Sequence, residues 1–310
     1  MAGLPGSYYG RRRWPGLGPT ARRAGLSVAG GRLWRMMKYG LDISPAGDWG
    51  RPDQIAELAA LSEDHGWDGV FCEDYLAFPG GRPTYDVWIT LGLVAHATTR
   101  LTLGTMVTPL PRRHPETVAL QAMSVDHVSG GRLVLGVGTG DSQGDLAGMT
   151  RGGPGQRSGA ILDEALDLVC RLWSGDRVSH SGEGYLVDGA RLVPPPVQRP
   201  RIPIWVGGAI TKQAPRDRAL RWDGACLYRV PPPDWEDLTP GDVAKLRADT
   251  GRSSYAIAVG GRERREDLVA ERRYVASLAE AGADWWHEYV PPRLTLTEAR
   301  RRIESGPLRA

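Results

Sequence analysis

Cysteine is scarce and long apolar runs are absent from this sequence of 310 residues. The only cysteines are Cys72, Cys170 and Cys226. Because their number is odd, they lie far apart and no CxxC pair occurs, they do not indicate a disulfide framework and they suit a reducing compartment. No stretch reaches the roughly 18 apolar residues of a membrane-spanning helix. We therefore expect a cytoplasmic protein with no membrane partner.

Several residue patterns that define common catalytic sites are also missing. The three lysines are Lys38, Lys212 and Lys245, and none lies late in a predicted strand, which argues against Schiff-base chemistry. The six histidines form no HxH pair, so we expect no metal site. No GxSxG turn or Ser/His/Asp arrangement supports a serine hydrolase. What remains is chemistry supplied by an organic cofactor.

Basic charge is concentrated in the first 35 residues, which hold seven arginines and no acidic residue. The remainder carries 32 basic and 36 acidic residues, so we expect no nucleic-acid partner. The segment "ARRAGLSVAGG" resembles a twin-arginine export signal, but its apolar run is too short. We interpret residues 1–35 as a disordered leader or the product of a start codon placed too early. Residues 36–310 then form the folded domain.

From Lys38 onward, strand-like and helix-like segments alternate in eight units. Such repeats are typical of a closed parallel (β/α)8 TIM barrel, and an open doubly wound sheet is the alternative. A dinucleotide fingerprint fails because Asp141 stands where a third glycine would follow Gly136 and Gly138. The predicted strands span residues 38–44, 69–74, 101–107, 132–137, 204–207, 223–227, 255–259 and 284–289.

An insertion separates the fourth helix from the fifth strand, and two short strand-like pieces in it surround Asp188-Gly189. An Asp-Gly pair between such pieces predicts a β-hairpin turn. On the last strand, we expect adjacent Trp285 and Trp286 to divide between the barrel interior and the helix-facing side, because successive strand residues point to opposite faces.

Small and polar residues follow the predicted strands, where the loops of a barrel build its site. Glycines there allow a ligand to approach backbone N–H groups, and a following helix N-terminus favours phosphate. The same glycines are also typical of tight turns, so both interpretations stay open. The residues at these strand ends are Asp74, Tyr75, Met106, Val107, Thr139, Gly140, Asp141, Gly207, Gly208 and Ala209.

Three segments in order carry a family resemblance: "TPLPRRHP", "SGGRLVLGVGTG" and "PIWVGG". With the residues around them, from Lys38 to Pro307, they resemble the bacterial luciferase-like superfamily of (β/α)8 oxidoreductases, which depend on FMN or coenzyme F420. The resemblance implies a small organic substrate, hydride transfer or oxygen activation, and a homodimer. It also implies that the insertion helps to cover the active-site mouth.

By the same resemblance, Thr139, Gly140 and Asp141 lie beside the flavin ring, and a cis peptide joins Met106 to Val107. Asp141 is then a candidate to serve a reacting proton, or it caps a turn. The phosphate would lie at Gly207, Gly208 and Ala209.

One departure concerns the end of the second strand. Many F420-dependent members carry Asp-His there, whereas this chain has Asp74-Tyr75. A tyrosine can stack or hydrogen-bond but cannot act as a base near neutral pH, so the histidine's role does not transfer. Asp74 either hydrogen-bonds beneath the cofactor, as a catalytic candidate, or caps its turn. An F420 dehydrogenase or reductase, an FMN monooxygenase and a non-catalytic binding or assembly barrel stay open.

Overall fold

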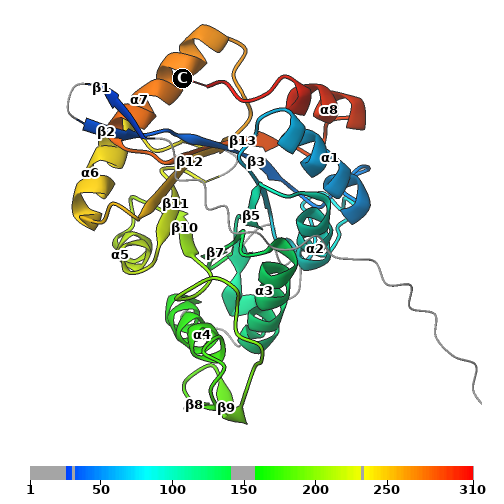
Figure 1. The fold of residues 1–310 in the computed structure, drawn as a ribbon, viewed down its shortest axis with the longest axis vertical. Helices are drawn as coiled ribbons and strands as arrows, with labels where there is room; N and C mark the ends of the chain where they lie inside the picture. Colours follow the sequence, from blue (N-terminus) through cyan, green and yellow to red (C-terminus); the bar gives the residue numbers. More distant parts are fainter. Residues whose placement is uncertain (1–25, 30–31, 141–157, 232–233, 310) are drawn as a thin grey trace, which may run out of the picture. The chain divides into compact units, whose positions relative to one another are not determined.

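The computed structural model describes residues 26–29, 32–140, 158–231 and 234–309 (Figure 1). The chain divides into two compact units, Met1–Met36 and Met37–Ala310, each described by itself. In the first unit, β1 (Leu26–Ala29) and β2 (Arg32–Arg35) pair antiparallel. Our interpretation of residues 1–35 as a disordered leader or the product of a start codon placed too early stays a prediction. The division at residue 35 stays a prediction.

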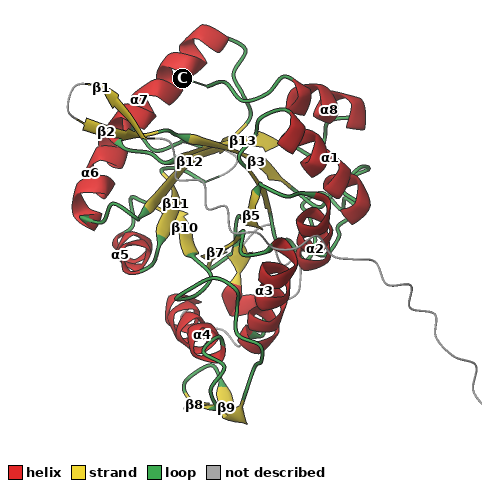
Figure 2. Ribbon diagram, in the orientation of Figure 1, coloured by secondary structure: helices red, strands yellow, loops and turns green. Residues whose placement is uncertain are grey.

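Eight parallel strands close into a ring in the second unit, which confirms the predicted (β/α)8 barrel (Figure 2). Each strand pairs with the next along the chain, β13 pairs with β3, and β7 pairs with β10. A short strand, β6 (Thr108–Pro109), also pairs with β7. The barrel strands are β3 (Lys38–Ile43), β4 (Gly69–Cys72), β5 (Thr102–Thr105), β7 (Leu133–Gly138), β10 (Ile204–Ala209), β11 (Gly224–Tyr228), β12 (Ala256–Arg262) and β13 (Trp285–Val290).

Helices follow the strands and surround them on the outside (Figures 1 and 2). Their starts carry recognisable signals: Thr239 and Thr295 form capping boxes, and the side chain of Asp86 accepts hydrogen bonds from the first turn of α2. The helices are α1 (Pro52–Asp64), α2 (Val87–Ala97), α3 (Pro115–Ser129), α4 (Ser158–Leu172), α5 (Gln213–Arg221), α6 (Pro240–Thr250), α7 (Leu268–Ala281) and α8 (Leu296–Glu304), and a 3-10 turn spans Leu110–Arg112.

Side chains on the strands alternate between two cores. Trp286 lies in the larger core between strands and helices, whereas Trp285 lies inside the barrel, which confirms the predicted division. Trp285 packs there with Phe71 and Trp205, whose rings stack with centroids 5.5 Å apart. These aromatic side chains fill the barrel interior below its carboxyl-terminal mouth. In (β/α)8 barrels the ligand site lies at this carboxyl-terminal end.

The insertion forms the hairpin β8 (Val178–Ser181) and β9 (Leu186–Ala190), but its turn is not where we predicted it. The turn precedes β9, and Glu164 of α4 fixes it by accepting hydrogen bonds from the backbone N–H groups of Gly184 and Tyr185. The Asp188-Gly189 pair lies within β9, beside a register irregularity of the ladder. Gly189 has a positive φ of 63°, and this backbone conformation belongs to the irregularity within β9 and not to the hairpin turn.

Candidate functional site

The end of β4 places two carboxylates on opposite sides of the barrel wall. Glu73 lies on the inner side, where Ser44 Oγ and Tyr289 OH both donate hydrogen bonds to its Oε2; the Tyr289 bond is 3.3 Å long. Burial, followed by the charge of Glu73, raises the pKa of Tyr289. This tyrosine therefore stays a neutral donor. Sequence reasoning did not select these three residues.

Asp74, a predicted catalytic residue, lies on the other side and is almost fully buried. Arg113 forms an ion pair with it. Burial raises the pKa of Asp74, and the charge and hydrogen bond of Arg113 act in the opposite direction. Its neighbour Tyr75 packs edge-on against Phe78, with ring centroids 5.1 Å apart. The geometry of Asp74 is that of a paired carboxylate, and its catalytic role stays a prediction.

The segment after β5 brings several predicted residues together. The Met106–Val107 peptide bond is cis, as the family resemblance implied. A Cβ atom built on Gly207 would lie 3.0 Å from one methyl group of Val107, and one built on Gly138 would lie 2.8 Å from the other. The ends of β5, β7 and β10 therefore meet around Val107, and the two glycines make room for it.

Thr139 and Gly140 follow β7 and are exposed. Gly140 has a φ of 84°, and its missing Cβ leaves space for the guanidinium of Arg112, whose Cζ would lie 2.6 Å from it. Asp141, the other predicted catalytic residue, lies outside the described residues.

Gly207, Gly208 and Ala209 form the end of β10, and α5 begins at Gln213. A Cβ atom on Gly208 would lie 2.8 Å from Pro215 Cβ, so this glycine permits close packing of the strand end against α5. The structure thus gives Gly208 a packing role, and the phosphate cradle stays a prediction.

The barrel interior holds a polar pair that sequence reasoning missed. His287 Nδ1 lies 2.7 Å from Asp42 Oδ1, and both side chains are buried. Asp42 is on β3 and His287 on β13, both at positions that point into the barrel. A charged or imidazole side chain at an inward position of a predicted strand was the available signal.

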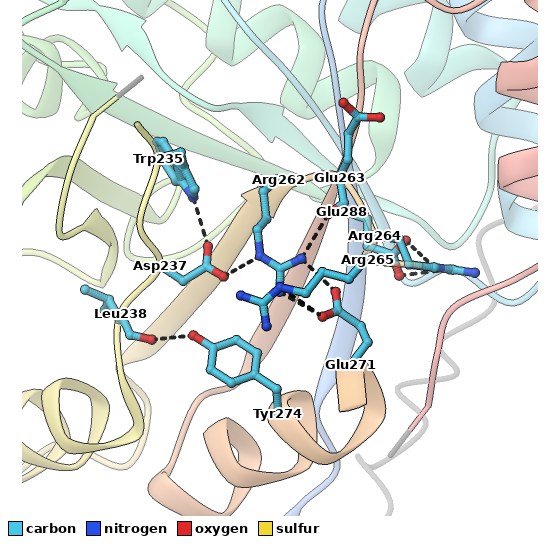
Figure 3. Close-up of polar contacts among 10 residues, drawn as sticks. All are labelled: Trp235, Asp237, Leu238, Arg262, Glu263, Arg264, Arg265, Glu271, Tyr274 and Glu288. Atoms are coloured by element: carbon cyan, nitrogen blue, oxygen red, sulfur yellow. Dashed lines mark hydrogen bonds and ion pairs between the residues drawn. The ribbon is translucent and has the colours of Figure 1, made fainter. Parts of the chain in front are cut away.

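A network of arginine ion pairs lies at the carboxyl ends of β12 and β13 (Figure 3). Arg262 donates to Asp237 at 2.7 Å and forms two bonds to Glu271, at 2.8 and 2.9 Å. Asp237 in turn accepts a 2.8 Å hydrogen bond from the indole of Trp235. The network therefore fixes the loop after β11 and the position of Trp235.

The described residues contain neither a metal-binding cluster nor a membrane-spanning helix. Among them, no group of three or more His, Cys, Asp or Glu side chains is arranged to hold a metal ion. No helix in the described ranges has the length and apolar character needed to cross a membrane.

Comparison with known proteins identifies the family. The model of the luciferase-like monooxygenase family matches residues 33–283, so the chain belongs to this family, as the three sequence segments indicated. Over 164 residues it is 37% identical to an F420-dependent glucose-6-phosphate dehydrogenase from Nakamurella multipartita, which covers 51% of this chain and 47% of the relative. The chain thus spans about half the length of the curated relatives it matches.

Two solved structures share the fold. A monooxygenase from Streptomyces bottropensis superposes with a TM-score of 0.68 at 18% identity, covering 86% of this chain and 96% of the other. An F420-dependent tetrahydromethanopterin reductase from Methanopyrus kandleri gives 0.65 at 16% identity, covering 87% and 96%. At these identities the likeness establishes the fold alone.

Proposed function

We propose that this chain is an oxidoreductase that uses coenzyme F420 to transfer hydride to or from a small organic substrate. The observation that carries the proposal is the 37% identity to an F420-dependent glucose-6-phosphate dehydrogenase, within a family that matches residues 33–283. When bound, F420 would supply the carbon that exchanges hydride with the substrate. The loops at the mouth of the barrel determine which substrate is bound, and the fold alone does not identify it.

The residues at the barrel mouth fit a planar ring with polar edges. Val107 offers an apolar wall between Gly138 and Gly207. Gly260 and Gly261 have φ values of 98° and 86°, and the missing Cβ of Gly261 leaves space between Asp42 and Trp235. Such glycines let a ring approach the backbone closely. We propose that the residues holding the cofactor are Tyr75, Met106, Val107, Thr139, Gly140, Gly207, Gly208 and Ala209.

The proposed roles of the two predicted carboxylates differ. Asp74 is paired with Arg113 beneath the mouth, and we assign it the role of holding that arginine and the segment after β6 in place. Asp141 is assigned proton exchange at the ring edge, because a carboxylate in a partly apolar cavity can hold or release a proton near neutral pH.

A second candidate is an FMN-dependent monooxygenase that activates oxygen. The description of the matching family supports it. A third is a barrel without catalysis that acts in binding or assembly. Fluorescence titration with F420, FMN and reduced FMN separates the three: saturable binding of F420 alone supports the proposal, binding of FMN supports the monooxygenase, and binding of neither supports the non-catalytic barrel.

We also propose a homodimer that forms through α2 and α3. Three large apolar side chains of these adjacent helices are exposed: Ile89 by 62%, Leu93 by 40% and Leu120 by 47%. Burying such a surface against a second copy would remove apolar area from water. For the compartment we propose the cytoplasm, which the free thiols of Cys72, Cys170 and Cys226 support.

A further inference from the structure

One carboxylate oxygen of Asp42 is hydrogen-bonded to the protein and the other is not. Oδ1 lies 2.7 Å from His287 Nδ1, which donates to it. For Oδ2, no hydrogen-bond donor lies within reach among the residues that the structure describes, and the atom is not sealed from solvent. A buried carboxylate normally has its hydrogen-bonding capacity satisfied, so an unoccupied oxygen at a ligand site indicates a donor that arrives with the ligand.

The strand register places this open oxygen at the mouth. Asp42 lies opposite Tyr289 on β13, whereas His287 lies opposite Gly40, two residues nearer the amino-terminal end of the barrel. His287 therefore lies on the amino-terminal side of Asp42 and holds its carboxylate in position. The ring of His287 is itself held by Phe71, with centroids 4.6 Å apart.

An aromatic wall stands next to the same oxygen. A Cβ atom on Gly261 would lie 3.3 Å from Asp42 Oδ2 and 3.4 Å from Trp235 Cζ2, so the carboxylate and the indole border one small space above this glycine. Trp235 is held there by its hydrogen bond to Asp237, which Arg262 anchors (Figure 3). A carboxylate oxygen beside an apolar indole suits a carbon skeleton that carries a hydroxyl group.

Three other carboxylates near the strand ends are bonded to protein side chains. Asp74 is paired with Arg113. Glu73 accepts hydrogen bonds from Ser44 and Tyr289. Glu288 forms two bonds to Arg264, at 2.8 and 2.9 Å. Among the described residues Asp74 Oδ2 also has no hydrogen-bond partner, but that atom is sealed from solvent, whereas the unbonded oxygen of Asp42 is not.

We propose that Asp42 is the proton acceptor for an alcohol substrate, and that His287 is the residue that positions it. This inference rests on the proposed function and adds the substrate class, a secondary or primary alcohol. The hydroxyl proton would pass to Asp42 Oδ2 as the carbinol carbon becomes a carbonyl carbon, and F420, when bound, would take up the hydride that this carbon loses. The alcohol is oxidised and F420 is reduced, and Asp42 returns its proton to solvent.

The test uses the full chain loaded with F420 and the probes propan-2-ol, cyclohexanol and glucose. Asp42→Asn keeps the size of the side chain and an oxygen for His287, but it cannot take the proton. We expect kcat to fall by about a hundredfold or more, the usual contribution of a general base, with F420 affinity unchanged. Asp64→Asn, on the exposed last residue of α1, is the matched control and should keep full activity.

The positioning role of His287 has its own readouts. His287→Asn retains an N–H donor at the place of Nδ1 and should retain most of kcat, whereas His287→Leu removes the donor and should lose it. Independently of turnover, the Nδ1 proton should give a downfield NMR resonance in the wild type that is missing from both variants.

Each failure has a distinct meaning. A wild type that binds no F420 would refute the proposed function and this inference together. Binding of F420 without oxidation of any of the three alcohols would refute the inference alone. So would an Asp42→Asn variant with kcat within threefold of the wild type, or equal activity of His287→Asn and His287→Leu.

Discussion

Removing the guanidinium of Arg262 tests how the mouth is held together. Arg262 joins the buried carboxylates of Asp237 and Glu271, whose side chains are 3% and 0% exposed. Burial alone would lower the pKa of Arg262, but the hydrogen bonds and charges of these two partners raise it on balance. The guanidinium also lies 5.0 Å from the ring centroid of Trp286. Arg262→Met keeps much of the aliphatic packing and removes the charge.

The expected loss follows from the two carboxylates that stay behind. Breaking a buried ion pair by removing one partner costs about 3–5 kcal/mol, because the remaining charge is left unpaired. Arg262 serves two carboxylates, so we expect the free energy of unfolding to fall to at least the upper part of this range. Arg262→Lys keeps a charge but cannot bond both partners in the same fork geometry, and it should lose about half as much.

Urea unfolding followed by tryptophan fluorescence measures this loss. Arg51→Met is the control, because the Arg51–Asp53 pair is exposed and its removal should leave the unfolding midpoint unchanged. A stability of Arg262→Met within about 1 kcal/mol of the wild type would refute the reasoning, since it would mean that Glu271 and Asp237 do not depend on this arginine.

Three further predictions concern the mouth, Asp74 and the α2 surface. Gly207→Ala should push Val107 away and weaken F420 binding at least several-fold in a fluorescence titration, whereas Gly241→Ala, where the nearest atom is 3.7 Å away, should not. Burial raises the pKa of Asp74 above its ordinary 3.8 despite the opposing effect of Arg113, so the folded state holds this proton more tightly than the unfolded state; the stability of the wild type relative to Asp74→Asn should therefore be full below about pH 3.8 and fall as pH rises from there to the raised pKa, and a difference that is constant from pH 3 to 8 would contradict this. Ile89→Arg should halve the mass measured by light scattering, while Leu186→Arg on the exposed hairpin should leave it unchanged.

The sequence predicted the barrel because alternation of segments is a local and repeated signal. Each strand-helix unit shows its own periodic pattern of apolar residues, and eight such units in succession predict a closed barrel. The predicted strand ends were also close enough to the observed ones to place Val107 beside Gly207, since the carboxyl ends of parallel strands meet at one rim.

The partners across the barrel could not be predicted in the same way. Asp42 and His287 are 245 residues apart, and only the closing register of β3 and β13 makes them neighbours. The pairing of Asp74 with Arg113 likewise depends on how the segment after β6 folds back. The hairpin turn was misplaced because an Asp-Gly pair can mark a strand irregularity as well as a turn, and the position of the turn depends on Glu164 of the preceding helix α4.

The central claim is that the mouth of this barrel binds F420, and fluorescence titration of the purified full chain with F420 tests it most directly. We predict a saturable change in F420 fluorescence with a Kd of about 1 μM or lower, a free energy of roughly −8 kcal/mol. FMN and reduced FMN should bind at least tenfold more weakly. No response up to about 100 μM F420, or tighter binding of FMN, would contradict the account.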